Sequence, residues 1–393
     1  MTDVRLDEVD LAGGMILGSV EGAGGWTGTA GPDRPIEAVE AVVLAGLVRP
    51  PCLVSFSGGR DSSALLAVAV QLAKREGLDA PVPITARFPG EETDEAEWQE
   101  LVIRHVGAPD WIQVEMTEEL DLLGEWGTSS LRRLGLRYPP NLHFQVPLLR
   151  RAEGGSLLSG AGGDELLVPH RWARAGQVLS GTVRLRPVDA LVVGVALAPR
   201  PIRVRMHQGW RPPLPSWLST EGRRVVQRRL FRWVGADPAR YDEHLAWWRN
   251  SRYLTHGQRS LELLAEDHGV AFLAPFSETR VLRALAKDRG GAGFASRTEA
   301  MRYLFGDLLP EELIGRRSKA SFLSPLVGPA TRSFATEADP EGVISAELAD
   351  HESLRRAWHE DVVDIRSLPA LQACWVAANI SKGDHGASDS VDR

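Results

Sequence analysis

Short apolar runs alternate with longer stretches of helical periodicity in the first part of the chain, and this alternation predicts the fold class. Apolar runs of strand length lie at 52–56, 82–88, 111–114 and 154–160. Apolar residues at helical spacing lie at 35–47, 62–75 and 93–106. A strand buried on both faces shows a continuous apolar run rather than an alternation. Strands separated by helices form a parallel sheet flanked by helices, so we predict an α/β fold of this kind.

The pattern changes along the chain, and the changes predict its organisation. Residues 1–35 are rich in glycine and carry few periodic signals, so we expect an irregular or β-like segment. From about Trp172 onward helix-like stretches dominate, interrupted by proline-rich linkers such as Pro212–Pro215. The polar residues at the end are expected to be disordered. We predict a short extension over 1–50, one domain over 51–380 with a largely helical C-terminal half, and a tail over 381–393.

Composition and charge narrow the class of protein. Hydrophobic residues make up 43% of the 393 residues, enough for an ordinary core. The formal net charge of −7 argues against a protein that coats nucleic acid. The chain has no apolar run long enough to span a membrane, and its start does not resemble a signal peptide. With only two cysteines, Cys52 and Cys374, these features predict a cytoplasmic protein that binds neither membrane nor nucleic acid.

The segment Ser57–Ser63, with the sequence SGGRDSS, follows a predicted strand and opens a predicted helix. Glycines let the backbone approach a phosphate closely, and free N–H groups at a helix start attract the anion. The hydroxyls of Ser57, Ser62 and Ser63 can donate hydrogen bonds to phosphate oxygens. Asp61 is anionic and cannot contact a phosphate directly, but it can bind a Mg²⁺ ion that bridges to phosphate oxygens. The segment therefore predicts a phosphate-binding loop with a metal ligand.

Two motifs resemble those of a known family. The loop lacks the lysine and the spacing of a Walker motif, and it resembles the S-G-G-x-D-S loop of the ATP pyrophosphatases, which cleave ATP between the α and β phosphates. The alternative is a glycine turn between strand and helix in an unrelated α/β protein. Leu158–Leu166, LSGAGGDEL, resembles the S-G-x-G-x-D-E segment of the synthetase domain of asparagine synthetase and its relatives, the β-lactam synthetases and lasso peptide cyclases. Phe272–Arg280 and Arg316–Phe322 resemble two further segments of that family, less closely.

The resemblance implies a fold, a nucleotide and a set of site residues. The fold is that of the ATP pyrophosphatases, which is adenine nucleotide α-hydrolase-like. The cofactors are ATP and Mg²⁺, with Asp61 and Asp164 as the metal ligands. Lys319 is the expected catalytic residue, because the lysine of this motif contacts the developing charge of the intermediate and the pyrophosphate. The residues expected to bind the nucleotide are Ser57, Gly58, Gly59, Asp61, Ser62, Ser63, Ser159 and Gly160.

The chain departs from asparagine synthetase at two points. Position 2 is Thr2, where that enzyme has the cysteine nucleophile of its N-terminal glutaminase domain. No such domain fits ahead of the loop, so we do not expect glutamine hydrolysis by this chain. The variable position of the second motif is a glutamate in asparagine synthetase and a tyrosine in β-lactam synthetase. Here it is Ala161, which has no group for proton transfer and leaves room for a larger acceptor.

These features together predict an ATP-dependent ligase that forms an amide bond. A carboxylate is adenylated, pyrophosphate leaves, and an amine displaces AMP. We expect a carboxylate substrate and an organic amine, one of them from a peptide or natural product, with macrolactam formation as one form of the reaction. The alternatives are amidation by free ammonia, a non-catalytic ATP-binding subunit, and sulfur transfer to tRNA, which the cysteine count and net charge weaken.

Three other features carry weaker predictions. Arginines are frequent between Arg184 and Arg232, so this segment could receive an acidic peptide or partner protein, although a solvated helix surface explains the pattern more simply. His256 could act as a base in place of Ala161, but a single histidine is more often structural. Trp247 and Trp248 could line a peptide groove, but tryptophans more often pack in a core.

Overall fold

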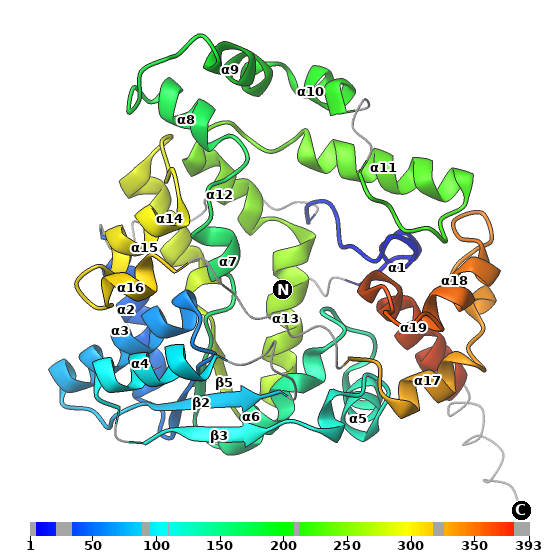
Figure 1. Ribbon diagram of the computed structural model, residues 1–393, viewed down its shortest axis with the longest axis horizontal. Coiled ribbons are helices and arrows are strands. Elements are labelled where there is room, and N and C mark those ends of the chain that lie inside the picture. The colour runs from blue at the N-terminus through cyan, green and yellow to red at the C-terminus, as the bar shows by residue number, and fades with distance from the viewer. Residues whose placement is uncertain are drawn as a thin grey trace, which may run out of the picture.

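A computed structural model describes residues 5–20, 34–88, 95–108, 110–207, 212–316 and 326–380. Among these residues, five parallel strands form one sheet in the order β3-β2-β1-β4-β5, at the lower left of Figure 1. The strands are β1 (Cys52–Ser55), β2 (Val82–Arg87), β3 (Ile112–Glu115), β4 (Ser156–Leu158) and β5 (Ala271–Leu273). The predicted α/β fold with a parallel sheet is confirmed.

Helices cover both faces of the sheet. One face packs against α2 (Pro35–Leu47), α3 (Arg60–Glu76) and α14 (Thr279–Arg289), and the other against α6 (Val146–Arg151) and α13 (Arg252–Asp267). Side chains of a strand point to alternate faces. Val54 and Leu158 accordingly join the first layer of the core, while Leu53 and Leu157 join the second. All four side chains are buried, so water is excluded from both faces of the central strands.

Helix α3 fixes the position of the loop that precedes it. The helix begins after Gly59 and ends at Gly77, which has a φ of 66° that glycine adopts without strain. Leu65 and Leu66 are fully buried against the sheet, and each such side chain contributes about 1.5–3 kcal/mol to folding. This packing holds the N-terminal end of α3, with Asp61 in its first turn, at the carboxyl end of β1.

Some of the remaining helices join the layers around the sheet, and others extend the molecule beyond it. They are α1 (Glu8–Gly13), α4 (Ala96–Val106), α5 (Glu125–Leu134), α7 (Gly163–Leu166), α8 (Ala173–Leu179), α9 (Asp189–Leu197), α10 (Arg200–His207), α11 (Thr220–Val234), α12 (Tyr241–Arg249), α15 (Arg297–Phe305), α16 (Glu311–Ile314), α17 (Pro329–Ala335), α18 (His351–Trp358) and α19 (Leu368–Asn379). Helices α8 to α11 run along the top of Figure 1, and α17 to α19 lie on its right. Trp217 and Trp358 are buried in a second core that joins α1, α11, α18 and α19. The predicted helical character of the C-terminal half agrees with this arrangement.

Two elements differ from the sequence prediction. Residues 1–35 were expected to be irregular or β-like, but α1 lies within them. It forms because Asp7 and Asp10 each accept a hydrogen bond from the other's backbone N–H, at 2.9 and 3.0 Å. Strand β5 was not predicted because it has only three residues, all of them half-buried at the edge of the sheet. Its pairing with β4, Leu157 opposite Phe272, is what makes it a strand.

The strand order places a crevice at the site that the sequence predicts. The chain goes from β1 outward to β2 and β3, and then returns to add β4 on the other side of β1. Connections at the carboxyl ends of β1 and β4 therefore diverge to opposite sides, which opens a crevice where α/β proteins bind ligands. The two predicted ATP motifs follow these two strands, so the fold brings them together.

Candidate active site

The loop after β1 is held in shape by its own serines and by α4. Ser57 Oγ and Ser62 Oγ lie 3.2 Å apart, and Ser62 Oγ donates to the Gly59 carbonyl at 3.1 Å. Gly58 has a φ of 83°, and a side chain there would also collide with Gln99 on α4, at 2.7 Å from its Cγ. Gln99 Nε2 donates to the Ser57 carbonyl at 3.0 Å. The loop is thus preorganised by contacts on both sides.

The loop after β4 packs directly on the first loop. A Cβ atom at Gly160 would lie 3.2 Å from the Ser62 nitrogen, and one at Gly163 would lie 2.5 Å from Asp61 Cγ. Gly162 has a φ of 90°, and a Cβ there would lie 2.7 Å from Ser277 Oγ. These approaches explain why the motif is rich in glycine. They also bring Asp164, in the short helix α7, beside the first turn of α3.

Arg297 joins the two carboxylates that the sequence predicts as metal ligands. Its Nη2 donates to Asp61 Oδ2 at 2.6 Å, and its Nη1 donates to Asp164 Oδ1 at 2.6 Å. Burial alone would lower the pKa of the Arg297 guanidinium, but Asp61 and then Asp164 raise it above its usual value. Two aspartates that are 103 positions apart in the sequence therefore lie within reach of a single cation.

Arg297 is the residue that the sequence prediction missed. It opens α15, where Ser296 Oγ accepts a hydrogen bond from the Glu299 N–H at 3.1 Å. That capping pattern of serine and glutamate is visible in the sequence and marks the start of the helix. It gives no sign, however, that the first side chain of the helix meets residues 236 and 133 positions earlier.

A buried ion pair connects the first loop to the segment that contains Lys319. The side chains of Glu95 and Arg316 are 6% and 5% exposed, and Arg316 Nη2 donates to Glu95 Oε1 at 2.6 Å. Arg316 Nη1 also donates to the Gly58 carbonyl at 3.1 Å, and its guanidinium lies 4.7 Å from the ring centre of Trp98. Arg316 thus helps to hold the loop after β1 in place. Lys319 itself lies outside the described residues, and its catalytic role stays a prediction.

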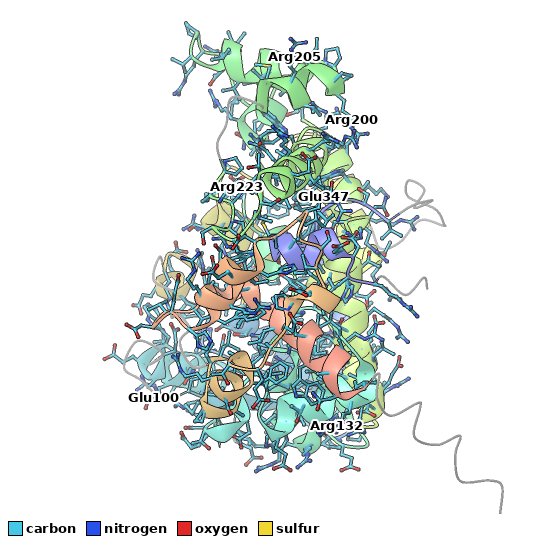
Figure 2. All side chains as sticks on the ribbon, turned by 90° about the vertical axis from the view of Figure 1, so that its right-hand side faces the viewer. Glu100, Arg132, Arg200, Arg205, Arg223 and Glu347 are labelled. Carbon is cyan, nitrogen blue, oxygen red and sulfur yellow. The ribbon has the colours of Figure 1, made fainter. Side chains whose placement is uncertain are left out.

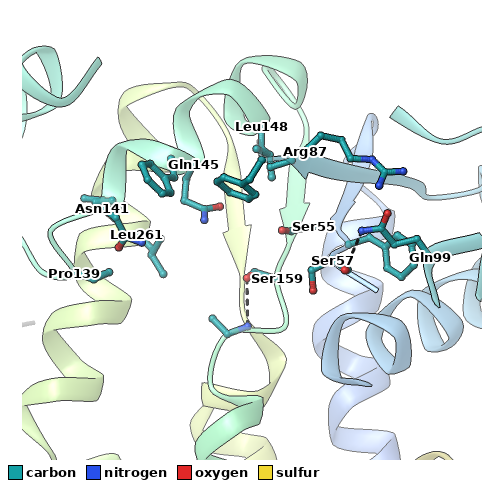
Figure 3. A pocket seen from close by; sticks show the side chains of 16 residues that line it. Ser55, Ser57, Arg87, Gln99, Pro139, Asn141, Gln145, Leu148, Ser159 and Leu261 are labelled. Atoms are coloured by element: carbon teal, nitrogen blue, oxygen red, sulfur yellow. Dashed lines mark hydrogen bonds between the residues drawn. The ribbon is translucent and has the colours of Figure 1, made fainter. Parts of the chain in front are cut away.

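A cleft of about 750 Å³ opens beside the two loops, as Figure 3 shows. Ser57 and Ser159 line it from the ends of β1 and β4, and Ala161 Cβ adds no polar group. The opposite wall comes from the segment ahead of α6 and from α6 itself. The lining residues of that wall are Pro139, Asn141, Leu142, Phe144, Gln145 and Leu148. The volume is in the range of sites that hold a nucleotide-sized ligand.

The predicted nucleotide residues do not all face this cleft. Ser57 and Ser159 line it, while Gly58, Gly59 and Gly160 shape the loops. Ser62 is 8% exposed and its hydroxyl is engaged within the loop. Ser63 is fully buried, and among the described residues its hydroxyl has no hydrogen-bond partner.

The weaker candidates lie away from the cleft. His256 is 2% exposed within α13, and its Nδ1 lies 3.2 Å from Ser260 Oγ. It is not among the residues that line the cleft. Trp247 and Trp248 also stay outside it, and their rings pack against Trp233 and Tyr253 at centroid distances of 4.8 and 5.6 Å.

The segment Arg184–Arg232 divides into a paired part and an exposed part. Arg229 on α11 is paired with Asp7 at 2.8 Å. The part over α9 and α10 instead exposes apolar side chains, with Val188 at 77% and Leu191 at 75%. Figure 2 shows Arg200 and Arg205 on the same projecting part, at the top of the molecule.

A comparison with known protein families shows to which family this chain belongs. The model of the family described as asparagine synthase matches residues 39–376, most of the chain. The chain belongs to the asparagine synthase family. The asparagine synthase match includes both loops, Arg297 and the Glu95–Arg316 pair. A search of curated proteins found no match.

Family membership assigns the general chemistry. Asparagine synthases use ATP in amidation and ligase reactions, so ATP-dependent ligase chemistry is assigned to this chain. No helix among the described residues has the length and apolar composition needed to cross a membrane. The extents of the predicted extension, domain and tail stay predictions.

Proposed function

We propose that this protein is an ATP-dependent ligase that adenylates a substrate carboxylate, releases pyrophosphate and forms an amide with an amine. One observation carries the proposal: Asp61 and Asp164 meet at a single cation. They follow Ser57 and Ser159, which line the cleft at the carboxyl ends of β1 and β4. Two carboxylates aimed at one point suit the binding of a triphosphate through Mg²⁺. Family membership supports the same nucleotide.

The residues present fit a Mg²⁺ ion. Mg²⁺ prefers oxygen ligands and is usually held by one or two carboxylates together with substrate phosphates and water. Asp61 and Asp164 would supply the protein oxygens, and the ion when bound would neutralise charge on the phosphates. Among the described residues, no group of three or more histidine, cysteine or acidic side chains is arranged as a metal site. Phosphate oxygens of ATP and water would complete the coordination.

The proposed reaction has two steps. A carboxylate oxygen of the acid attacks the α-phosphorus of ATP, the bond from that phosphorus to the bridging oxygen breaks, and pyrophosphate leaves with the electron pair. The amine nitrogen then attacks the acyl carbon, the bond from carbon to the AMP oxygen breaks, and the nitrogen loses a proton. The loop after β1, Ser57–Ser63, orients the phosphates of ATP. Lys319 stabilises the charge that grows during the first step.

Ala161 shapes our proposal for the acceptor. Its methyl group lies on the cleft wall and cannot transfer a proton, which favours an amine larger than ammonia from a peptide or natural product. Macrolactam formation, in which acid and amine belong to one molecule, is included. Amidation by free ammonia and a non-catalytic ATP-binding role are the alternatives. We place the reaction in the cytoplasm, where ATP is available and the buried thiols of Cys52 and Cys374 stay reduced.

We also propose that an acidic polypeptide that carries the substrate docks on α9 and α10. This surface combines exposed apolar residues with arginines, and its one acid, Asp189, is already paired with Arg174 at 2.6 Å. Charge complementarity therefore favours an acidic occupant that also offers apolar side chains.

Exchange of labelled pyrophosphate into ATP tests the proposed function. Purified protein is incubated with Mg²⁺, ATP and a panel of carboxylic acids, and hydroxylamine in parallel samples traps an acyl adenylate as its hydroxamate. We expect exchange above background only with an accepted acid, and loss of exchange in Asp164→Asn. Release of ADP and orthophosphate with that acid would contradict the proposal. Tight ATP binding without exchange for any acid would favour the non-catalytic alternative.

A further inference from the structure

Arg297 occupies the position between Asp61 and Asp164 that a bridging divalent ion would need. Each of its two terminal nitrogens donates to one carboxylate at 2.6 Å. The side chain of Arg297 is 17% exposed and that of Asp61 is 13% exposed, so water screens this contact only in part, whereas the side chain of Asp164 is 47% exposed. The ion pair with Asp61 is therefore stronger than one on a solvated surface.

A guanidinium and a divalent ion would compete for these carboxylates. The hydrogen bonds use Asp61 Oδ2 and Asp164 Oδ1, one oxygen of each carboxylate that would hold the ion. Its double charge would also lie within a few ångströms of the arginine charge in a partly buried place, where repulsion is large. Arg60, which lies close enough to Arg297 for the two cations to interact, adds positive charge on this side.

ATP would offer Arg297 other partners than the two aspartates. Arg297 Nε is buried, and among the described residues it has no hydrogen-bond partner. The guanidinium thus has a further donor that its two carboxylate contacts do not use. A triphosphate bound by the β1 loop would bring several anionic oxygens to the same place, and arginine binds phosphate in a fork geometry.

We infer that Arg297 closes the two-carboxylate site to a lone divalent ion, and that the triphosphate of ATP opens it by taking over the guanidinium. The inference rests on the proposed function, and it adds that ATP and the metal ion bind together rather than in succession. Each ligand would then raise the affinity of the protein for the other. Such couplings typically change an affinity by about 5- to 150-fold.

Binding of Mn²⁺, measured from the paramagnetic resonance signal of the free ion and corrected with matched samples that hold ATP but no protein, tests the inference without any turnover. We expect the full-length protein to bind Mn²⁺ weakly alone and at least about 10-fold more tightly with ATP. Arg297→Gln removes the charge and should bind Mn²⁺ alone about 10-fold more tightly than the parent. Arg302→Gln, on the same helix but in an exposed pair with Glu311, is the matched control and should behave as the parent does.

The outcomes separate the inference from the proposed function. If the parent binds Mn²⁺ equally well with and without ATP, the closure by Arg297 is wrong, even if ATP is used. The same conclusion follows if Arg297→Gln keeps its melting temperature and binds Mn²⁺ no better than the parent does. Should Arg297→Gln not fold, Arg297→Met, which also removes the charge, takes its place. If no variant binds Mn²⁺ together with ATP, the proposed function itself is wrong.

Discussion

The side chains of Asp61 and Asp164 differ in their surroundings although they are expected to share one ion. Asp61 is 13% exposed in the first turn of α3, while Asp164 is 47% exposed in α7. The exposed carboxylate can adjust to a ligand, whereas the buried one is fixed by the loop. The sequence could predict both residues because each belongs to a local motif. It could not predict Arg297, since the contact exists only after distant segments fold together.

Replacement of either aspartate should stop ATP use and leave the fold intact. Asp61→Asn and Asp164→Asn each remove one charge from the metal site with almost no change in volume. We expect turnover to fall by at least about 10²-fold, since charge stabilisation of this kind is typically worth that much. Pyrophosphate release and the melting temperature are measured on the same samples. Turnover at the parental rate in either variant would rule out the metal assignment.

Lys319→Ala should separate binding from catalysis. If Lys319 contacts charge that develops only in the transition state, its loss lowers the rate by about 10²–10³-fold and changes ATP affinity little. Affinity instead depends on the loop of Ser57–Ser63. Calorimetry with ATP and a coupled assay for pyrophosphate give the two quantities. A variant with normal affinity and a parental rate would show that Lys319 has no part in the reaction.

At the level of elements, the sequence predicted the strands and helices that carry strong local signals. β1, β2, β3 and β4 are apolar runs, and α3 follows a glycine-rich loop, so periodicity was enough to find them. β5 was not predicted, because its pairing with β4, rather than the pattern of its own three residues, makes it a strand. The ion pair of Glu95 and Arg316 was not predicted either, because the two residues are 221 positions apart in the sequence.

Loss of the Glu95–Arg316 pair should destabilise the protein more than loss of a surface pair. Arg316→Met leaves the Glu95 carboxylate buried without its partner and removes the donor to the Gly58 carbonyl. We expect the free energy of unfolding to fall by about 3–5 kcal/mol. Arg302→Met, in an exposed pair, should lower the free energy of unfolding much less. Urea titration compares the two, and equal effects would mean that the buried pair does not support the loop.

The whole molecule places the proposed nucleotide site at one end and an exposed surface at the other. Figure 2 shows Arg200 and Arg205 far from Glu100 and Arg132, which lie near the sheet end. The sequence indicated that the segment was basic. It could not show which arginines are paired within the fold, as Arg229 is, and which stay exposed.

Charge reversal on α10 should weaken recognition of an acidic polypeptide substrate and leave the chemistry unchanged. For Arg200→Glu with Arg205→Glu, we expect KM for such a substrate to rise about 10-fold or more at low salt, with kcat nearly constant. The effect should shrink at high salt because exposed charges are screened. Leu191→Ser tests the apolar part of the surface in the same assay. Unchanged KM in all of these variants would remove α9 and α10 from substrate recognition.

The transfer of an oxygen atom from the acid to AMP tests the adenylation step most directly. The acid found by pyrophosphate exchange is labelled with ¹⁸O in its carboxylate and turned over with ATP and the amine, and the products are analysed by mass spectrometry. Because a carboxylate oxygen bonds to the α-phosphorus and leaves with AMP, the label should appear as one ¹⁸O atom in AMP, with pyrophosphate unlabelled. Label in orthophosphate, accompanied by ADP, would show attack at the γ-phosphate and contradict adenylation.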